Sequence, residues 1–250
     1  RQSARRHQDA SPHLRGGVVG MCLQVAAMIV LIAGLCSAAV DLAPGEKWNG
    51  SVLLDSGVWA DPAVGPHVKV LASSVRASLP EEVPPWAMDQ ASVAGNYWAT
   101  IARAPQIEFV RGDSSAEIQI KFCRSDSDLP AGTHLYKNIV AFAIPKIDTR
   151  RQEIAGATVV FNLRDFEFAD RCDPVAGSFG NREGKLVAFP LALVHELGHC
   201  LGLGDGPGQC RNIMEPIIIY VFVDGRRPCK CLTEAGPWDV QGMRFLYGNP

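Results

Sequence analysis

The stretch "KLVAFPLALVHELGHCLGLGD", residues 185–205, decides the fold. Apolar residues run through it, with a proline at position 190 near its start and glycines at positions 202 and 204 near its end. Proline suits the first turn of a helix, and glycine adopts the left-handed conformation that ends one. The pattern therefore predicts a largely apolar helix that begins near Pro190 and stops close to Gly202.

Two histidines stand four residues apart in this predicted helix. Residues i and i+4 lie on one helical face about a turn apart, so His195 and His199 can point at the same ion. Asp205 follows the end of the helix, and a carboxylate oxygen is an acceptable zinc ligand. Three protein ligands leave one position for water, which is the pattern of a catalytic zinc site. We therefore predict His195, His199 and Asp205 as ligands of one zinc ion.

Glu196 is rotated by about 100° from His195 on a helix, so it does not easily bind the same ion. It can instead reach a water molecule on that ion and take its proton as a general base. The sequence thus predicts Glu196 as the catalytic residue of a zinc-dependent hydrolase. The alternative is a helix with two hydrogen-bonded histidines and no metal.

The composition is that of an ordinary globular protein. The 250 residues are 47% hydrophobic and 20% charged, and the formal net charge is −2. These values exclude a disordered or fibrous chain, and they give no support for a nucleic-acid partner. We expect a monomer with one folded domain.

The first 40 residues differ from the rest of the chain. Residues 1–20 are basic and polar, and residues 18–40 form an apolar run that ends in small residues, "CSAAV". The run fits either a signal peptide at 21–39 or a membrane anchor of about 20 residues. Both readings imply export, with membrane contact only if the leader is kept. We expect an irregular segment at 40–84 and a catalytic domain at 85–250.

Six cysteines follow the apolar run: Cys123, Cys172, Cys200, Cys210, Cys229 and Cys231. In an oxidising compartment six cysteines are typical of up to three disulfides. The alternative is a second metal site built on the "CKC" segment at 229–231.

The remaining elements follow from hydrophobic periodicity. We predict a helix at 87–103, strands at 107–112, 116–123, 138–147 and 157–163, a long loop at 164–186, and a final helix within 233–248. A polar turn joins the first two strands, and residues 67–75 fit either a strand or a helix start. Within the first helix, four residues should face the core: Val93, Tyr97, Trp98 and Ile101. This order predicts an α+β fold.

The motif "HELGHCLGLGD", residues 195–205, resembles that of the metzincin zinc peptidases, whose third ligand is histidine or, in some members such as the snapalysins, aspartate. Residues 96–122 are similar to the helix and strands that open matrixin catalytic domains. "RNIMEP" resembles their Met-turn and would place Met214 beneath the zinc. "DVQGMRFLYG" is similar to their C-terminal helix.

This resemblance implies a metzincin-like catalytic domain, with a twisted and mostly parallel sheet, an active-site helix and a C-terminal helix. It implies a zinc-dependent endopeptidase acting on proteins or peptides. Residues 157–163 would form the edge strand that pairs with substrate, and residues 216–223 would either wall a substrate pocket or form a core strand. Tyr220 is a candidate site residue.

The chain also departs from the matrixins. It has no inhibitory cysteine motif ahead of the domain, and it lacks the histidine-rich loop of their second zinc site, for which His134 is a lone candidate. Calcium ligands cannot be aligned, so calcium binding has no support in the sequence. The alternative function is an exported zinc-binding module without catalysis.

Overall fold

The structure is a computed structural model. It describes residues 69–129, 133–137, 139–151, 153–170, 177–205, 213–214 and 235–248, and the backbone of three short strands. These strands, β1 (Lys47–Trp48), β2 (Ser51–Leu53) and β3 (Trp59–Ala60), form a small antiparallel sheet. The chain divides into two compact units, Arg1–Ala38 and Ala39–Pro250, and every described residue belongs to the second.

Several predictions fall outside the described residues. They concern the leader at 21–39, the segment at 216–223 with Tyr220, and the cysteines Cys172, Cys210, Cys229 and Cys231. Cys123 and Cys200 are described, and both are buried free thiols. None of the described helices has the length and apolar character needed to cross a membrane.

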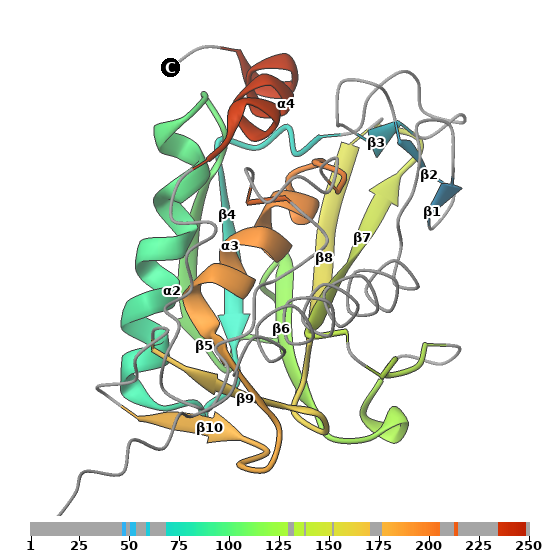
Figure 1. The fold of residues 1–250 in the computed structure, drawn as a ribbon. Helices are drawn as coiled ribbons and strands as arrows, with labels where there is room; N and C mark the ends of the chain where they lie inside the picture. Colours follow the sequence, from blue (N-terminus) through green and yellow to red (C-terminus); the bar gives the residue numbers. More distant parts are fainter. Residues whose placement is uncertain are drawn as a thin grey trace, which may run out of the picture. The chain divides into compact units, whose positions relative to one another are not determined.

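A five-stranded sheet forms the centre of the fold (Figure 1). Its strands, in spatial order, are β5 (Gln106–Arg111), β4 (Ser74–Leu79), β6 (Ile118–Cys123), β8 (Glu153–Asn162) and β7 (Ala141–Asp148). All neighbouring pairs are parallel except β7 and β8, which are antiparallel. The prediction of a mostly parallel sheet combined with helices is confirmed.

The strand β4 lies ahead of the predicted domain start at residue 85 and yet is an inner strand of the sheet. It also lies between β5 and β6, which follow each other in the chain through the predicted polar turn but do not pair with each other. Parallel partners are set by contacts between distant parts of the chain, and a short turn signal says nothing about them. The sheet therefore includes residues that we had assigned to the irregular segment 40–84.

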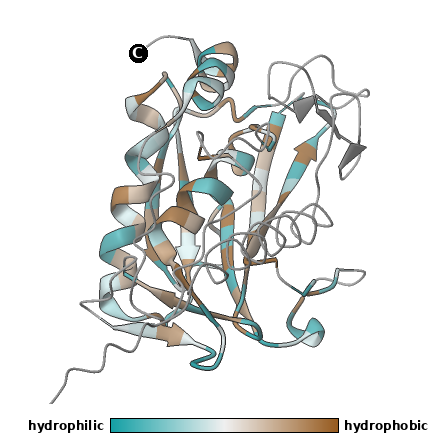
Figure 2. Ribbon diagram, in the orientation of Figure 1, coloured by the Kyte–Doolittle hydropathy of each residue, from teal (hydrophilic) through white to brown (hydrophobic). Residues whose placement is uncertain are grey.

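The prediction that residues 157–163 form the edge strand is wrong. Residues 157–162 belong to β8, which has β6 on one side and β7 on the other. Among the described strands, β7 and not β8 therefore lies at this edge of the sheet. Nine of the ten β8 residues are buried, which is typical of a strand with neighbours on both sides. Hydrophobic residues recur along both strands (Figure 2).

The open side of β7 follows from its hydrogen-bond register. The Asn162 N–H donates to the Val140 carbonyl oxygen at 2.9 Å, so the even-numbered residues of β7 pair with β8. The backbone groups of Ala141, Ala143 and Pro145 therefore point away from β8. Proline has no N–H to donate and is found in sheets at such edge positions.

Three helices accompany the sheet: α2 (Pro85–Tyr97), α3 (Phe189–Cys200) and α4 (Pro237–Tyr247). A 3-10 turn, η1 (Trp98–Thr100), extends α2. Each helix has a proline in its first turn, where the missing N–H does no harm. The helices α2 and α3 pack together, and the fully buried Trp98 joins them by donating its indole N–H to the Val194 carbonyl at 2.9 Å (Figure 1).

Val93 does not face the core, because its side chain is 71% exposed. Trp98 is fully buried, and Tyr97 and Ile101 are partly buried against the core, as predicted. The buried positions of α2 are small residues: Ala87, Ala91, Ala94 and Gly95. A Cβ on Gly95 would overlap the Ile107 carbonyl oxygen, so close packing of helix on sheet selects small side chains here.

The predicted loop at 164–186 contains two short strands and the beginning of a third. They are β9 (Phe166–Ala169), β10 (Ser178–Gly180) and β11 (Lys185–Ala188), in the order β10-β9-β11. The strand β11 runs directly into α3 and so fixes where that helix begins. Aromatic rings join this small sheet to the main one, with Phe168 and Phe161 5.2 Å apart between ring centroids.

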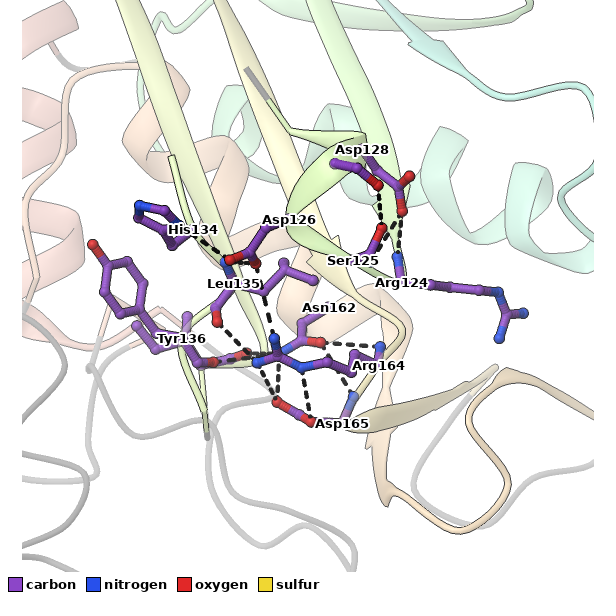
Figure 3. Close-up of polar contacts among 12 residues, drawn as sticks. Arg124, Ser125, Asp126, Asp128, His134, Leu135, Tyr136, Asn162, Arg164 and Asp165 are labelled. Carbon is purple, nitrogen blue, oxygen red and sulfur yellow. Dashed lines mark hydrogen bonds and ion pairs between the residues drawn. The ribbon is translucent and has the colours of Figure 1, made fainter. Parts of the chain in front are cut away.

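A polar network fixes the segment after β6 to the end of β8 (Figure 3). In it Asp126, which begins the 3-10 turn η2 (Asp126–Asp128), accepts the Leu135 N–H at 2.8 Å. Arg164 donates to the Leu135 carbonyl at 2.8 Å and pairs with Asp165 at 3.1 Å. Loop and strand are thus held by charge-assisted hydrogen bonds.

Candidate metal centre

The helix α3 places His195 and His199 one turn apart on a buried face, and their Nε2 atoms lie 3.1 Å from each other. The helix then ends, and Gly202 has a φ of 106°, a conformation that glycine adopts without strain. This turn returns the chain to the histidines. The Asp205 Oδ1 lies 3.6 Å from His195 Nε2 and 3.5 Å from His199 Nε2.

These separations fit a single small cation. Zinc binds histidine nitrogen and carboxylate oxygen at about 2.0–2.2 Å in a tetrahedron, so two ligand atoms should lie about 3.3–3.6 Å apart. The three observed distances are 3.1, 3.5 and 3.6 Å. Within the described part of the chain this is the only group of three or more such side chains that could hold a metal ion.

Hydrogen bonds to the other ring nitrogens orient both histidines. His195 Nδ1 lies 2.7 Å from the Ile213 carbonyl oxygen, and His199 Nδ1 lies 2.8 Å from the Leu203 carbonyl oxygen. A carbonyl oxygen only accepts, so each Nδ1 carries a proton and each Nε2 faces the centre. Fixing the ring in this way is how proteins prepare histidine for a metal.

In the metal-free centre the two histidines differ in their affinity for a proton. Burial and the neighbouring His199 together lower the pKa of His195 to about 4. Burial also opposes the charged form of His199, but the Asp205 carboxylate outweighs it and raises the pKa of His199 to about 9. A metal ion bound here would displace that proton, as metal ions do at histidine sites.

Glu196 lies beside the three ligands but is not one of them. Its side chain is 1% exposed, and its Oε2 is buried without a hydrogen-bond partner among the described residues. Burial raises the pKa of Glu196 to about 8, Asp205 adds to the rise, and His199 and the Ala143 N–H oppose it. Because Ala143 belongs to β7, the carboxylate stands next to the sheet edge.

Met214 forms an apolar floor under α3. It is fully buried, and its sulfur packs so closely on Gly198 that a Cβ at that position would overlap it. Gly198 stands between the two histidines in the sequence, so this contact supports the helical turn that carries them.

Asp239, near the start of α4, is fully buried. It accepts the backbone N–H groups of Ile213 at 2.5 Å, Met214 at 3.1 Å and Gly236 at 3.0 Å. Nothing in the local sequence reveals the first two bonds, because the partners are 25 and 26 residues away.

His134 takes no part in the centre. Its exposed ring pairs with Asp126 at 3.0 Å in the network of Figure 3.

Neither a protein-family model nor a curated protein matches the sequence. The function must therefore be argued from the site itself.

Proposed function

We propose that the protein is an exported zinc-dependent endopeptidase of metzincin type that hydrolyses proteins or peptides. One observation carries the proposal: three ligand atoms at tetrahedral spacing stand beside a separate buried carboxylate with an unpartnered oxygen. A closed structural site has no use for that carboxylate, whereas hydrolysis requires a base next to the metal.

His195, His199 and Asp205 would hold the zinc, which when bound supplies a Lewis acid for the scissile carbonyl and for water. Glu196 accepts a proton from the attacking water and delivers it to the leaving amine. Met214 and Gly198 keep the helix that carries these residues in place.

The substrate would bind along the open side of β7. An extended peptide can add to a sheet edge through backbone hydrogen bonds. Ala141 offers both an N–H and a carbonyl on that side, whereas Ala143 and Pro145 offer only their carbonyls, because the Ala143 N–H contacts Glu196 and proline has no N–H. The Glu196 carboxylate lies at Ala143, so cleavage would take place opposite the middle of this strand.

The test combines zinc content with cleavage of casein and of a quenched-fluorescence peptide library. Wild type should bind one zinc per chain and cleave. Glu196→Gln should keep the zinc and lose cleavage by a factor of about 100 or more, because the base is gone. His199→Ala should lose both.

Two outcomes would contradict the proposal. Zinc binding without any cleavage by wild type would favour an exported zinc-binding module without catalysis. Cleavage that survives in Glu196→Gln would show that this residue is not the base.

A further inference from the structure

The Asp239 carboxylate is a buried charge that is surrounded by backbone hydrogen-bond donors. Its side chain is fully buried, and both oxygens accept backbone N–H groups. Burying a carboxylate costs several kcal/mol unless hydrogen bonds compensate it. The bond from Gly236 explains the start of α4, but the bonds from Ile213 and Met214 serve no helix.

A single peptide unit connects this carboxylate to His195. The Met214 N–H and the Ile213 carbonyl belong to the same planar amide, and the described chain has no cis peptide bonds. The N–H donates to Asp239 Oδ1 at 3.1 Å, and the carbonyl accepts from His195 Nδ1 at 2.7 Å. In a trans amide these groups point in opposite directions, so the unit bridges the two side chains.

The bridge has an electrostatic consequence. A negative charge at the N–H end polarises the amide and strengthens the carbonyl as an acceptor at the other end. A stronger acceptor at Nδ1 fixes the ring and makes Nε2 a better donor to a metal. For His199 the acceptor is the Leu203 carbonyl, which shares its peptide unit with the Gly204 N–H. Among the described residues no carboxylate accepts that N–H, so this arrangement belongs to His195 and not to His199.

We propose that Asp239 is a positioning residue for His195, acting through the peptide bond between Ile213 and Met214. It holds Nδ1 protonated and directs Nε2 at the metal position. The inference rests on the proposed role of His195 as a metal ligand, but it does not require peptidase activity. Asp239 itself touches neither metal nor substrate.

The test uses the isosteric substitution Asp239→Asn, which replaces one acceptor oxygen by a donor. In the metal-free protein, ring-nitrogen NMR should show His195 losing its fixed Nδ1 proton, while the His199 signals stay as in wild type. Zinc affinity, measured by competition with a chelating dye, should fall by about 10- to 100-fold. Because both rings belong to one helix, His199 is an internal reference.

Leu246→Ala provides the matched control. It removes a buried side chain from α4 but keeps the Asp239 carboxylate, at a cost of about 2–5 kcal/mol in stability. It should leave the His195 signals and the zinc affinity unchanged. Equal effects in both variants would overturn the proposal, as would wild-type signals and affinity in Asp239→Asn.

A measurement on wild type needs no variant. The Met214 amide should exchange with solvent as slowly as the core of α3, since its bond to Asp239 is buried. Rapid exchange would overturn the bridge. Failure of the protein to cleave peptides would contradict the proposed activity and would leave these results standing.

Discussion

At the scale of single residues, the candidate centre depends on Gly198 having no side chain. Gly198 separates the two histidines, and the Met214 sulfur fills the space that a Cβ would need. We expect Gly198→Ala to lower the free energy of unfolding by about 1–3 kcal/mol, because a packed interior does not admit an extra methyl group without strain. Urea unfolding followed by circular dichroism measures the loss.

The double variant Gly198→Ala/Met214→Ala tests the cause. Met214→Ala alone should be destabilising because it leaves a cavity, but that cavity can accept the new methyl group. The double variant should therefore lose about 0.5–3 kcal/mol less than the sum of the single losses. Simple additivity would show that the overlap with Met214 is not the source of strain.

At the scale of elements, α4 is fastened at its far end by Tyr247. Its hydroxyl donates to the Leu201 carbonyl at 2.7 Å and accepts the Val70 N–H at 3.0 Å, and burial raises its pKa. Tyr247→Phe should cost about 1–3 kcal/mol, because both backbone groups lose this partner. Thermal and urea unfolding check the value. Tyr136→Phe, at an exposed tyrosine, should change stability by less than about 0.5 kcal/mol.

The polar network at the end of β8 makes the stability of the fold depend on pH in the acidic range. The hydrogen bond from Arg164 holds the pKa of Asp165 below its usual range, against a smaller effect of burial. A lowered folded-state pKa means that Asp165 adds stability above the unfolded value of about 3.9 and loses it as pH falls through the folded value. Asp165→Asn should therefore flatten the decline of stability between about pH 4 and pH 2. An equal flattening in Asp89→Asn, on the exposed side of α2, would contradict this.

At the scale of the whole molecule, a bound metal would link folding to zinc. A ligand present at 1,000 times its dissociation constant adds about 4 kcal/mol to stability, which is roughly 10 °C in Tm for a domain of this size. We expect a chelator to lower Tm by that order and added zinc to restore it. His199→Ala should be insensitive to both treatments. If the chelator left the Tm of wild type unchanged, that result would contradict a metal site.

The residues of the candidate centre could be predicted from the sequence because they lie close together along the chain. His195, His199 and Asp205 lie within eleven residues, and helical periodicity with one glycine turn brings them together. The strand order was not accessible, since β4 between β5 and β6 depends on contacts between distant segments. Asp239 was missed as a contact of the centre for the same reason.

Pro145 has a further consequence for how copies of this protein meet. An uncovered sheet edge can recruit the same strand from another molecule and start a growing fibre. Such growth needs an uninterrupted ladder, but Pro145 withholds a donor and an irregularity follows between Lys146 and Ile147. The edge that we propose for substrate binding is therefore a poor template for stacking further copies of β7.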